Sequence, residues 1–177
     1  MPFVADTFLL SQLDFPSVNI KPNWNIRTSE RGLQEDTMNR FAFHTCGSIR
    51  FGNGLFADLG QIAKAALGER VLLVTDAGMV ATGIVERALL SLRKSGIDVI
   101  LYADVLADPP ESVVLAATKL AKTNRQGVIG LGGGSSLDVA KLAALLATSS
   151  QTLPEMYGIG NAVGPRLPLM LVPTTAG

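Results

Sequence analysis

From residue 41 onward, two kinds of hydrophobic pattern alternate along the chain. Short runs of β-branched and leucine residues predict strands, over residues 71–74, 98–102, 127–131 and 167–172. Two stretches of alternating character predict shorter strands at 41–43 and 49–51. Between these runs, apolar residues recur every three or four positions, which predicts helices, over residues 55–66, 82–95, 111–123 and 136–148.

Strands and helices that alternate in this way favour an α/β fold, in which a parallel sheet carries helices on both faces. The run Val71–Val74 is apolar at every position, as is typical of a strand that is buried on both sides. In open sheets of this kind, ligands bind beyond the carboxyl ends of the strands. We therefore expect the functional residues in the loops that follow the strands, all at one edge of the sheet.

The chain has 177 residues, of which 47% are hydrophobic, so it can bury a substantial core. Residues 1–38 contain Pro2, Pro16 and Pro22 and show no sustained period. We predict that they form an N-terminal extension that is at least partly disordered. The remainder, 39–177, is predicted to be one α/β domain.

Composition excludes several classes of function. Lysines and arginines number 15, as do aspartates and glutamates, and this balance argues against a nucleic-acid partner. The single cysteine, Cys46, excludes an internal disulfide, and the single histidine, His44, excludes a histidine-rich metal site within the chain. No apolar run approaches the ~20 residues of a membrane-spanning helix, and no secretory signal is present. We therefore expect a cytoplasmic protein with no membrane partner.

Three adjacent glycines, Gly132–Gly134, separate the predicted strand 127–131 from the helix that follows. Glycines allow a ligand to approach the backbone, and the free N–H groups and dipole of a helix N-terminus favour a phosphate. The alternative is a turn closed by a capping box, in which Ser135 caps the helix and Asp138 reaches back. Three glycines exceed what a cap needs, which favours a bound pyrophosphate.

Asp76 follows the strand 71–74 and is the acidic residue that suits a ribose. A carboxylate there accepts hydrogen bonds from both ribose hydroxyls and repels a 2′-phosphate, which favours NAD over NADP. The alternative is a simple turn residue ahead of Gly78. The stretch Gly130–Ser135 differs from the standard dinucleotide fingerprint at its third glycine, and no Gly-Lys-Ser/Thr follows to make a P-loop.

Two stretches resemble the nucleotide-site signatures of iron-containing (group III) alcohol dehydrogenases. They are residues 130–141 (Gly-Leu-Gly-Gly-Gly-Ser-Ser-Leu-Asp-Val-Ala-Lys) and 172–177 (Val-Pro-Thr-Thr-Ala-Gly). Phe51–Gly54 and Val74–Gly78 are similar to two further motifs in the first domain of that family. The resemblance implies a Rossmann-like NAD-binding domain of the dehydroquinate synthase-like kind. In the family, a helical second domain binds Fe²⁺ or sometimes Zn²⁺.

The resemblance also implies cofactor-binding roles for residues of the glycine-rich loop. Gly133, Gly134 and Ser135 would hold the pyrophosphate of NAD, and Asp138 would anchor the loop.

For the adenosine half of NAD, the resemblance implies contacts from three other loops. Asp76 would contact the ribose, Thr174 and Thr175 would line the adenine and ribose side, and Met79 would pack near the adenine. Asp108 stands where the family often has asparagine, and it would add negative charge near the nicotinamide end.

The second signature of the family continues beyond Ala-Gly into Thr-Gly-Ser-Glu, whereas this sequence stops at Gly177. The metal ligands of the family, one aspartate and three histidines, belong to its second domain. The resemblance therefore implies that this chain contains no catalytic residue and no metal ligand. We expect a fragment, the cofactor-binding half of an NAD-dependent, metal-containing alcohol dehydrogenase, and we expect it to be inactive alone.

Such an enzyme would oxidise a small alcohol to an aldehyde or ketone by hydride transfer, and the resemblance suggests a homo-oligomer. Two alternatives stay open at this point. One is a non-catalytic module that binds a nucleotide or a partner. The other is a relative of the glycerol dehydrogenases, which share the fold and differ in substrate.

Overall fold

The computed structural model describes residues 47–175 of the chain. The predicted extension 1–38 and the predicted strand 41–43 lie outside the described residues, as do His44 and Cys46. None of the helices in the described part of the chain is long and apolar enough to cross a membrane.

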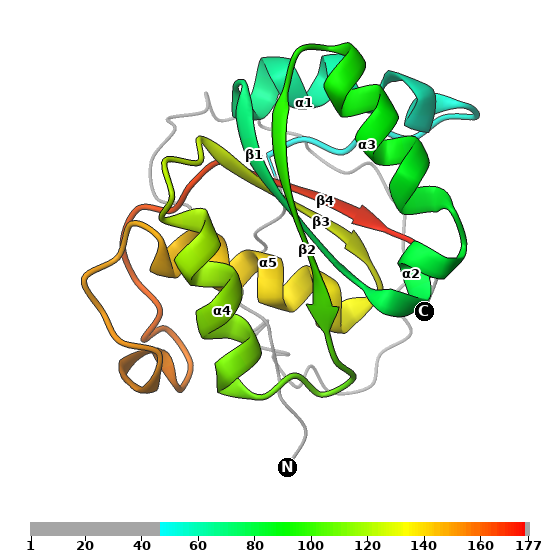
Figure 1. Ribbon diagram of the computed structural model, residues 1–177. Helices are drawn as coiled ribbons and strands as arrows, with labels where there is room; N and C mark the ends of the chain where they lie inside the picture. The colour runs from blue at the N-terminus through cyan, green and yellow to red at the C-terminus, as the bar shows by residue number, and fades with distance from the viewer. Residues whose placement is uncertain (1–46, 176–177) are drawn as a thin grey trace, which may run out of the picture. The chain divides into compact units, whose positions relative to one another are not determined.

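Four parallel strands form one sheet in the order β2-β1-β3-β4 (Figure 1). They are β1 (Arg70–Asp76), β2 (Asp98–Val105), β3 (Gly127–Gly132) and β4 (Leu169–Pro173). All four strands predicted from apolar runs are confirmed, although β2 continues three residues further than predicted. Because β1 pairs with β2 on one side and with β3 on the other, the strand order reverses between β1 and β3. A reversal of this kind opens a crevice beyond the carboxyl ends of the two strands.

Helices cover both faces of the sheet, as the alternating pattern predicts (Figure 1). Helices α1 and α3 pack on one face, and α4 and α5 pack on the other. The α-helices are α1 (Leu59–Leu67), α2 (Ala77–Ala81), α3 (Ile84–Lys94), α4 (Glu111–Ala121) and α5 (Gly134–Leu146). Two short 3₁₀ helices are η1 (Leu55–Asp58) and η2 (Pro154–Met156).

The side chains of the central strand β1 alternate between the two helical layers. Leu72 and Val74 pack with α4 and α5, whereas Val71 and Leu73 pack with α1 and α3. All four are fully buried because both faces are covered, which explains why the run is apolar at every position. Truncating such a buried leucine to alanine typically costs about 2–5 kcal/mol. This core holds the ends of the strands, and therefore their loops, in place.

Helix α3 ends at the glycine that the sequence predicts as its stop. Gly96 has a φ of +78°, and its N–H donates to the carbonyl of Arg93 (2.9 Å). The next residue, Ile97, donates from its N–H to the carbonyl of Leu92 (3.1 Å). These two bonds form a Schellman motif, in which glycine takes the left-handed position without strain.

Two local features differ from the predictions. Residues 49–51 are not a strand, and the side chain of Phe51 is 99% exposed. The alternation there does not form a strand because β structure depends on a neighbouring strand and on burial of one face. Helix α2 was not predicted, because its five residues are too few to show an apolar period.

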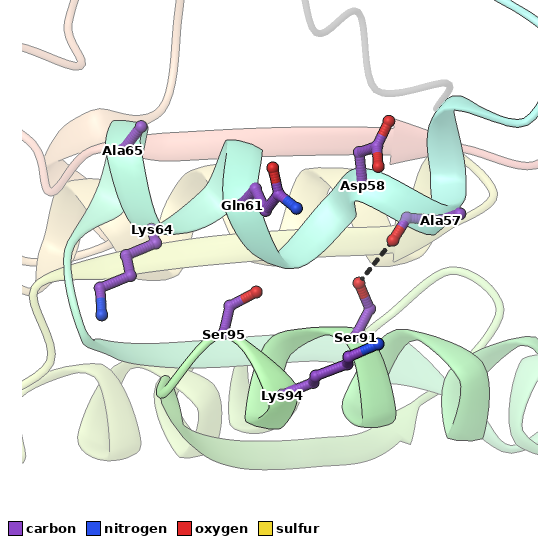
Figure 2. Close-up of a pocket in the computed structure, with 8 residues that line it drawn as sticks. All are labelled: Ala57, Asp58, Gln61, Lys64, Ala65, Ser91, Lys94 and Ser95. Carbon is purple, nitrogen blue, oxygen red and sulfur yellow. Dashed lines mark hydrogen bonds between the residues drawn. The ribbon is translucent and has the colours of Figure 1, made fainter.

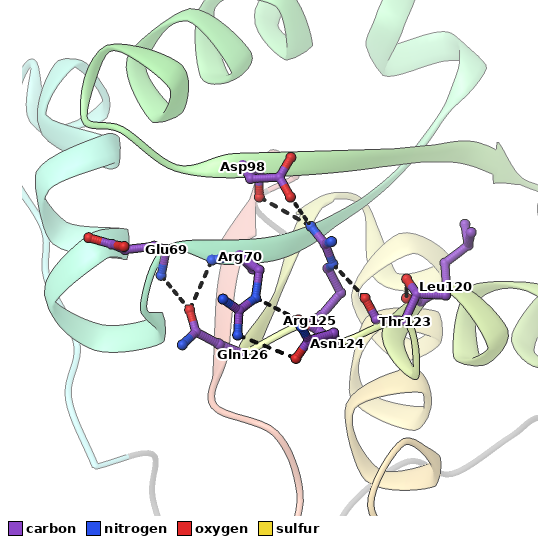
Figure 3. A network of polar contacts seen from close by, with 8 residues as sticks. All are labelled: Glu69, Arg70, Asp98, Leu120, Thr123, Asn124, Arg125 and Gln126. Atoms are coloured by element: carbon purple, nitrogen blue, oxygen red, sulfur yellow. Dashed lines mark hydrogen bonds and ion pairs between the residues drawn. The ribbon is translucent and has the colours of Figure 1, made fainter.

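Side chains at the amino ends of the strands bind neighbouring segments to each other (Figure 3). The Gln126 side-chain oxygen, just before β3, accepts hydrogen bonds from the N–H groups of Glu69 (2.7 Å) and Arg70 (3.1 Å). The Arg70 guanidinium donates to the backbone carbonyl (2.9 Å) and the side-chain oxygen (3.3 Å) of Asn124. These bonds fix the start of β1 against the segment that leads into β3.

Candidate functional site

The loops after β1, β2 and β3 meet around a hollow of about 360 Å³. The hollow lies at the carboxyl edge of the sheet, where the strand order reverses between β1 and β3. It is lined by residues from the end of β1 and the start of α2, the end of β2, and the start of α5, namely Asp76, Ala77, Gly78, Val105, Leu106, Ala107, Gly133, Gly134, Ser135 and Ser136. The prediction that these loops share one edge is confirmed.

Gly132 is the last residue of β3, next to the hollow, and its backbone and surroundings favour a glycine. Its φ is +145°, a region that residues with a side chain rarely adopt. A Cβ at this position would lie 2.9 Å from Ser136 Oγ and 3.2 Å from Asp76 Oδ2. The Gly132 carbonyl accepts a hydrogen bond from the N–H of Thr174 (3.0 Å), which holds the loop after β4 against the glycine-rich loop.

The first turn of α5 is free of side-chain caps, which corrects the capping-box prediction. The helix begins at Gly134, two residues before the predicted start, so Ser135 lies inside the helix and Gly133 is the N-cap. No side chain of the described residues caps this end, and Asp138 pairs with Lys141 (3.0 Å) rather than reaching back. The prediction fails because the N-cap position, with its extended backbone (φ −80°, ψ −176°), belongs to Gly133, which has no side chain to accept from the first turn.

The two glycines of this turn leave room in front of the helix N-terminus. A Cβ at Gly134 would meet nothing within 4 Å, and a Cβ at Gly133 would meet only Thr175 Cγ2, at 3.8 Å. The residues that line the hollow include no lysine and no arginine. An anion in this hollow would therefore be held by backbone N–H groups and by the positive end of the α5 dipole.

Among the described residues that line the hollow, Asp76 is the only charged one, and both of its carboxylate oxygens accept a hydrogen bond. Oδ1 accepts from the N–H of Met79 (2.9 Å), which makes Asp76 the N-cap of α2. Oδ2 accepts from the hydroxyl of Ser136 (3.0 Å). In place of the simple turn considered for Asp76, the structure gives it a structural role as the last residue of β1 and the cap of a helix. It is compatible with ligand binding, because each carboxylate oxygen can accept a second hydrogen bond.

The remaining predicted residues lie around the hollow without lining it. Thr174 and Thr175 follow β4 and are exposed, and the Thr174 hydroxyl donates to the sulfur of Met79 (3.5 Å). This contact joins the loop after β4 to α2. Asp138 is half-buried on α5, one turn beyond the hollow, where it pairs with Lys141. Asp108 is exposed and has a φ of +48° in the loop after β2, next to lining residue Ala107.

Ser136 is a residue of the site that the sequence interpretation missed. It lines the hollow, its side chain is 1% exposed, and it donates to Asp76. The buried positions of α5 include 136, 139, 140 and 143, which is the spacing of one helical face. Extending the apolar face Val139, Ala140 and Ala143 back by one turn would have placed Ser136 on the buried side.

Comparison with known proteins identifies the family of this chain. A model for the family described as iron-containing alcohol dehydrogenase matches residues 46–177. The chain is a member of the iron-containing alcohol dehydrogenase family. The resemblance inferred from the two signatures is therefore confirmed.

Individual members of the family are similar to this chain over its domain. A sulfoacetaldehyde reductase of Bilophila wadsworthia (strain 3_1_6) is 31% identical over 138 residues, which cover 77% of this chain and 36% of the relative. The structure of NADH-dependent butanol dehydrogenase A from Thermotoga maritima matches with a TM-score of 0.68 and 31% identity, over 77% of this chain and 35% of the other. A sulfoacetaldehyde reductase from Bifidobacterium kashiwanohense, in complex with NAD⁺, matches with a TM-score of 0.63 and 28% identity, over 72% and 34%. The chain thus spans about a third of the length of these relatives.

The described residues of this family member offer no fit for the metal of the family name. Among residues 47–175, no three histidine, cysteine, aspartate or glutamate side chains gather in a way that would hold a metal ion. The chemistry of the site is therefore that of a backbone cradle with one carboxylate beside it.

A larger hollow, of about 750 Å³, lies between α1 and α3 and contains none of the predicted cofactor-binding residues (Figure 2). Its lining comes from these two helices and the end of η1, namely Ala57, Asp58, Gln61, Lys64, Ala65, Ser91, Lys94 and Ser95. The Ser91 hydroxyl donates to the carbonyl of Ala57 (3.0 Å) and accepts from the N–H of Gly60 (3.0 Å). A Cβ at Gly60 would clash with the backbone of Ser91, so α1 and α3 are in close contact beside this hollow.

Proposed function

We propose that residues 39–177 form the NAD-binding domain of an NAD-dependent, metal-containing alcohol dehydrogenase that oxidises a small alcohol to an aldehyde or ketone. The observation that carries this proposal is the open, uncapped start of α5 beside the Asp76 carboxylate, at the point where the strand order reverses. Membership of the iron-containing alcohol dehydrogenase family supports it.

The glycine-rich loop fits a pyrophosphate. Gly133 and Gly134 present backbone without side chains, and the N–H groups of the first turn of α5 have no side-chain cap among the described residues. In the proposed complex, the N–H groups of Gly134 and Ser135 donate to the pyrophosphate oxygens, and the helix dipole favours their negative charge. The anchoring of the loop by Asp138 stays part of the proposal, and in the structure the Asp138 carboxylate pairs with Lys141 within α5 (3.0 Å).

Asp76 fits the adenosine ribose and accounts for a preference for NAD. Its carboxylate is half-buried and held from two sides by Met79 N–H and Ser136 Oγ, so it is oriented before a ligand arrives. The free lone pairs of the carboxylate would accept hydrogen bonds from the ribose hydroxyls. A 2′-phosphate at the same place would bring a second negative charge against it, and the lining residues within 47–175 include no cation to compensate. In the same complex Met79, Thr174 and Thr175 surround the adenine side.

The contribution of this domain to the reaction is orientation. When bound, NAD supplies the nicotinamide ring that accepts a hydride from the alcohol carbon. The residues of the hollow would hold the pyrophosphate and the ribose at two separate points, which fixes the direction in which the nicotinamide half extends. No step is assigned to the metal, because the described residues offer no site that fits one.

Titration calorimetry of the purified protein with NAD⁺, NADH and NADP⁺ tests the proposal. We expect NAD⁺ and NADH to bind and NADP⁺ to bind at least about tenfold more weakly, the equivalent of about 1.4 kcal/mol. Absence of heat with NAD⁺ and NADH, from protein whose circular dichroism shows a folded α/β chain, would contradict the cofactor assignment.

The variant Asp76→Asn sharpens this test. The amide oxygen of asparagine can still accept from the Met79 N–H, so the cap of α2 is kept while the negative charge is lost. We expect the affinity ratio between NAD⁺ and NADP⁺ to fall towards one. An unchanged ratio would show that Asp76 does not contact the ribose.

Limited proteolysis tests the proposed domain boundary. We expect cleavage within residues 1–38 and a resistant fragment that begins near residue 39. Resistance of the first 38 residues would contradict their assignment as an extension.

A further inference from the structure

We infer that Ser136 is a positioning residue that holds the Asp76 carboxylate and thereby determines how strongly the site prefers NAD to NADP. This inference rests on the proposed function, and it assigns a role to a side chain to which the family resemblance gave none. It is carried by the burial of Ser136, its hydrogen bond to Asp76 and the path of β1 beside it.

The hydroxyl of Ser136 is buried and is bonded to Asp76 alone among the described residues. The side chain is 1% exposed, and the distance from its Oγ to Asp76 Oδ2 is 3.0 Å. A buried hydroxyl without a partner is unfavourable, so this hydroxyl is held on the carboxylate. Because the acceptor is ionised, the bond belongs to the stronger, charge-assisted kind.

The space for this bond depends on Gly132. A Cβ at Gly132 would lie 2.9 Å from Ser136 Oγ and 3.2 Å from Asp76 Oδ2, which is where the two side chains meet. The absence of a side chain at Gly132 therefore allows the serine and the aspartate to approach each other. The glycine-rich loop in this way serves the carboxylate as well as the pyrophosphate.

The bond also connects β1 to α5 beyond the last paired residues of β1 and β3. Pairing between β1 and β3 ends at Val74 and Gly130, whereas pairing between β1 and β2 continues to Asp76 and Val105. The last residue of β1 has thus left β3, and the Ser136 hydroxyl joins it to the start of α5. One residue earlier, the buried Thr75 hydroxyl donates to the carbonyl of Leu131 in β3 (2.7 Å). The two contacts together hold the end of β1 beside the start of α5, and the Ser136 bond is the one that reaches the carboxylate.

The Ser136 bond should affect the orientation of the Asp76 carboxylate, and through it the choice between NAD and NADP, more than the affinity for NAD. Met79 N–H holds Oδ1 and Ser136 Oγ holds Oδ2, so the plane of the carboxylate is fixed from both sides. Without the serine hydroxyl, Oδ2 is free to turn. A carboxylate that turns can move away from a 2′-phosphate, so discrimination against NADP should weaken more than the affinity for NAD.

The test compares Ser136→Ala with Ser91→Ala. Ser91 also makes two hydrogen bonds, but it lies between α1 and α3 and does not line the candidate site. For each variant, calorimetry measures the dissociation constants of NAD⁺ and NADP⁺, and thermal unfolding measures stability. We expect Ser136→Ala to lower the ratio of the NADP⁺ constant to the NAD⁺ constant about tenfold, and Ser91→Ala to leave the ratio unchanged.

A second pair of variants separates positioning from general damage. In the Asp76→Asn background, Ser136→Ala should leave the ratio unchanged, because the charge that it positions is gone. Should Ser136→Ala fail to fold, Ser136→Cys keeps the size of the side chain with a weaker donor, and it should lower the ratio in the same direction.

The outcomes distinguish the two proposals. If the unaltered protein binds neither NAD⁺ nor NADP⁺, the proposed function fails. If it binds NAD⁺ selectively and Ser136→Ala weakens both cofactors equally, the serine is only structural and the inference is overturned. The inference is supported if Ser136→Ala lowers the ratio in protein that retains Asp76 and leaves it unchanged in the Asp76→Asn variant.

Discussion

At the amino ends of the strands, polar side chains bond to one another and to the backbone of neighbouring segments. Gln126 and Arg70 join β1 to the segment before β3, and Arg125 joins that segment to Asp98 at the start of β2 (Figure 3). At the carboxyl ends, glycines and short hydroxyl side chains surround a hollow between β1 and β3. One sheet therefore has a closed, bonded edge and an edge that is open to a ligand.

This contrast separates what stabilises the domain from what we propose binds the cofactor. The polar groups of the amino edge already have partners within the chain, so they contribute to folding and offer little to a ligand. The first turn of α5 has no side-chain cap among the described residues, and Gly134 faces open space. We therefore expect substitutions at the amino edge to change stability alone, and substitutions at the carboxyl edge to change cofactor affinity.

The largest effect is expected for Gly132→Ala, which should disturb stability and binding together. The residue has a φ of +145°, and a methyl group there would press on Ser136 and Asp76. We expect the free energy of unfolding, measured by urea titration, to fall by at least about 2 kcal/mol. Affinity for NAD⁺ should fall as well, because the clash moves the Asp76 carboxylate.

Gly160→Ala is the control for this prediction. Gly160 also has a positive φ, +78°, but a Cβ there would meet nothing within 4 Å. We expect it to lose about 1 kcal/mol, from the backbone conformation alone, and to keep its affinity for NAD⁺. Equal losses in the two variants would show that the contact with Ser136 and Asp76 is not tight.

The next effect in size concerns affinity alone. Gly134→Ala places a methyl group in open space at the first position of α5, so the free energy of unfolding should change by less than about 0.5 kcal/mol. The same methyl group would stand between the helix N-terminus and the proposed pyrophosphate. We expect the dissociation constant of NAD⁺ to rise about tenfold, or about 1.4 kcal/mol, in calorimetry.

Gly52→Ala is the matched variant, because Gly52 also faces open space but does not line the hollow. It should leave both quantities unchanged. If Gly134→Ala binds NAD⁺ as tightly as Gly52→Ala does, the pyrophosphate is not held at the start of α5.

At the amino edge, Gln126→Ala should show the opposite behaviour. The side-chain oxygen of Gln126 accepts from two backbone N–H groups, those of Glu69 and Arg70, and water would replace it in the variant. We expect a loss of about 1 kcal/mol in the free energy of unfolding and no change in NAD⁺ affinity. Gln61→Ala is the control, since Gln61 is exposed and its amide bonds to no residue of the described range. A change in NAD⁺ affinity with Gln126→Ala would contradict the expectation that the amino edge affects stability alone.

The two edges also differ in how far their structure follows from the sequence. Strands that run parallel all end at the same edge of the sheet, and the loops that contain Asp76 and Gly132–Gly134 were predicted to share that edge for this reason. The hydrophobic pattern did not show at which residue α5 begins. A serine next to glycines can cap a helix or enter it, so the start of α5 was placed two residues late and Ser136 was missed.

The bonds of the amino edge were beyond prediction from a single sequence. Arg70 and Asn124 are 54 residues apart, and neither lies in a periodic pattern that would place one opposite the other. Surface polar residues have no required spacing, because water satisfies them equally well when they are unpaired. Helix α2 also could not be predicted, because its five residues do not complete two turns and therefore show no repeating apolar face.

The smallest effect is expected for the pair at the outer end of this edge, between Arg125 and Asp98. The guanidinium lies 2.7 Å from the Asp98 carboxylate, but the Asp98 side chain is 64% exposed. The guanidinium also donates to the backbone carbonyls of Thr123 (3.2 Å) and Asp98 (3.5 Å), so it keeps partners when the carboxylate is neutralised. We expect Asp98→Asn to lower the free energy of unfolding by about 0.5 kcal/mol or less at low salt.

Salt provides the check on that last prediction. The Debye length shortens to about 3 Å at 1 M salt, so the difference between Asp98→Asn and the unaltered protein should disappear there if it is electrostatic. Glu69→Gln removes the charge that pairs with Lys64 (3.1 Å), and its loss of stability should also disappear at 1 M salt. That loss should be smaller than for Asp98→Asn, because both members of the Lys64–Glu69 pair are exposed. A loss that persists at 1 M salt would mean that Asp98 acts through packing or its own hydrogen bonds. The link between Asp98 and Arg125 would then depend on more than the attraction of opposite charges.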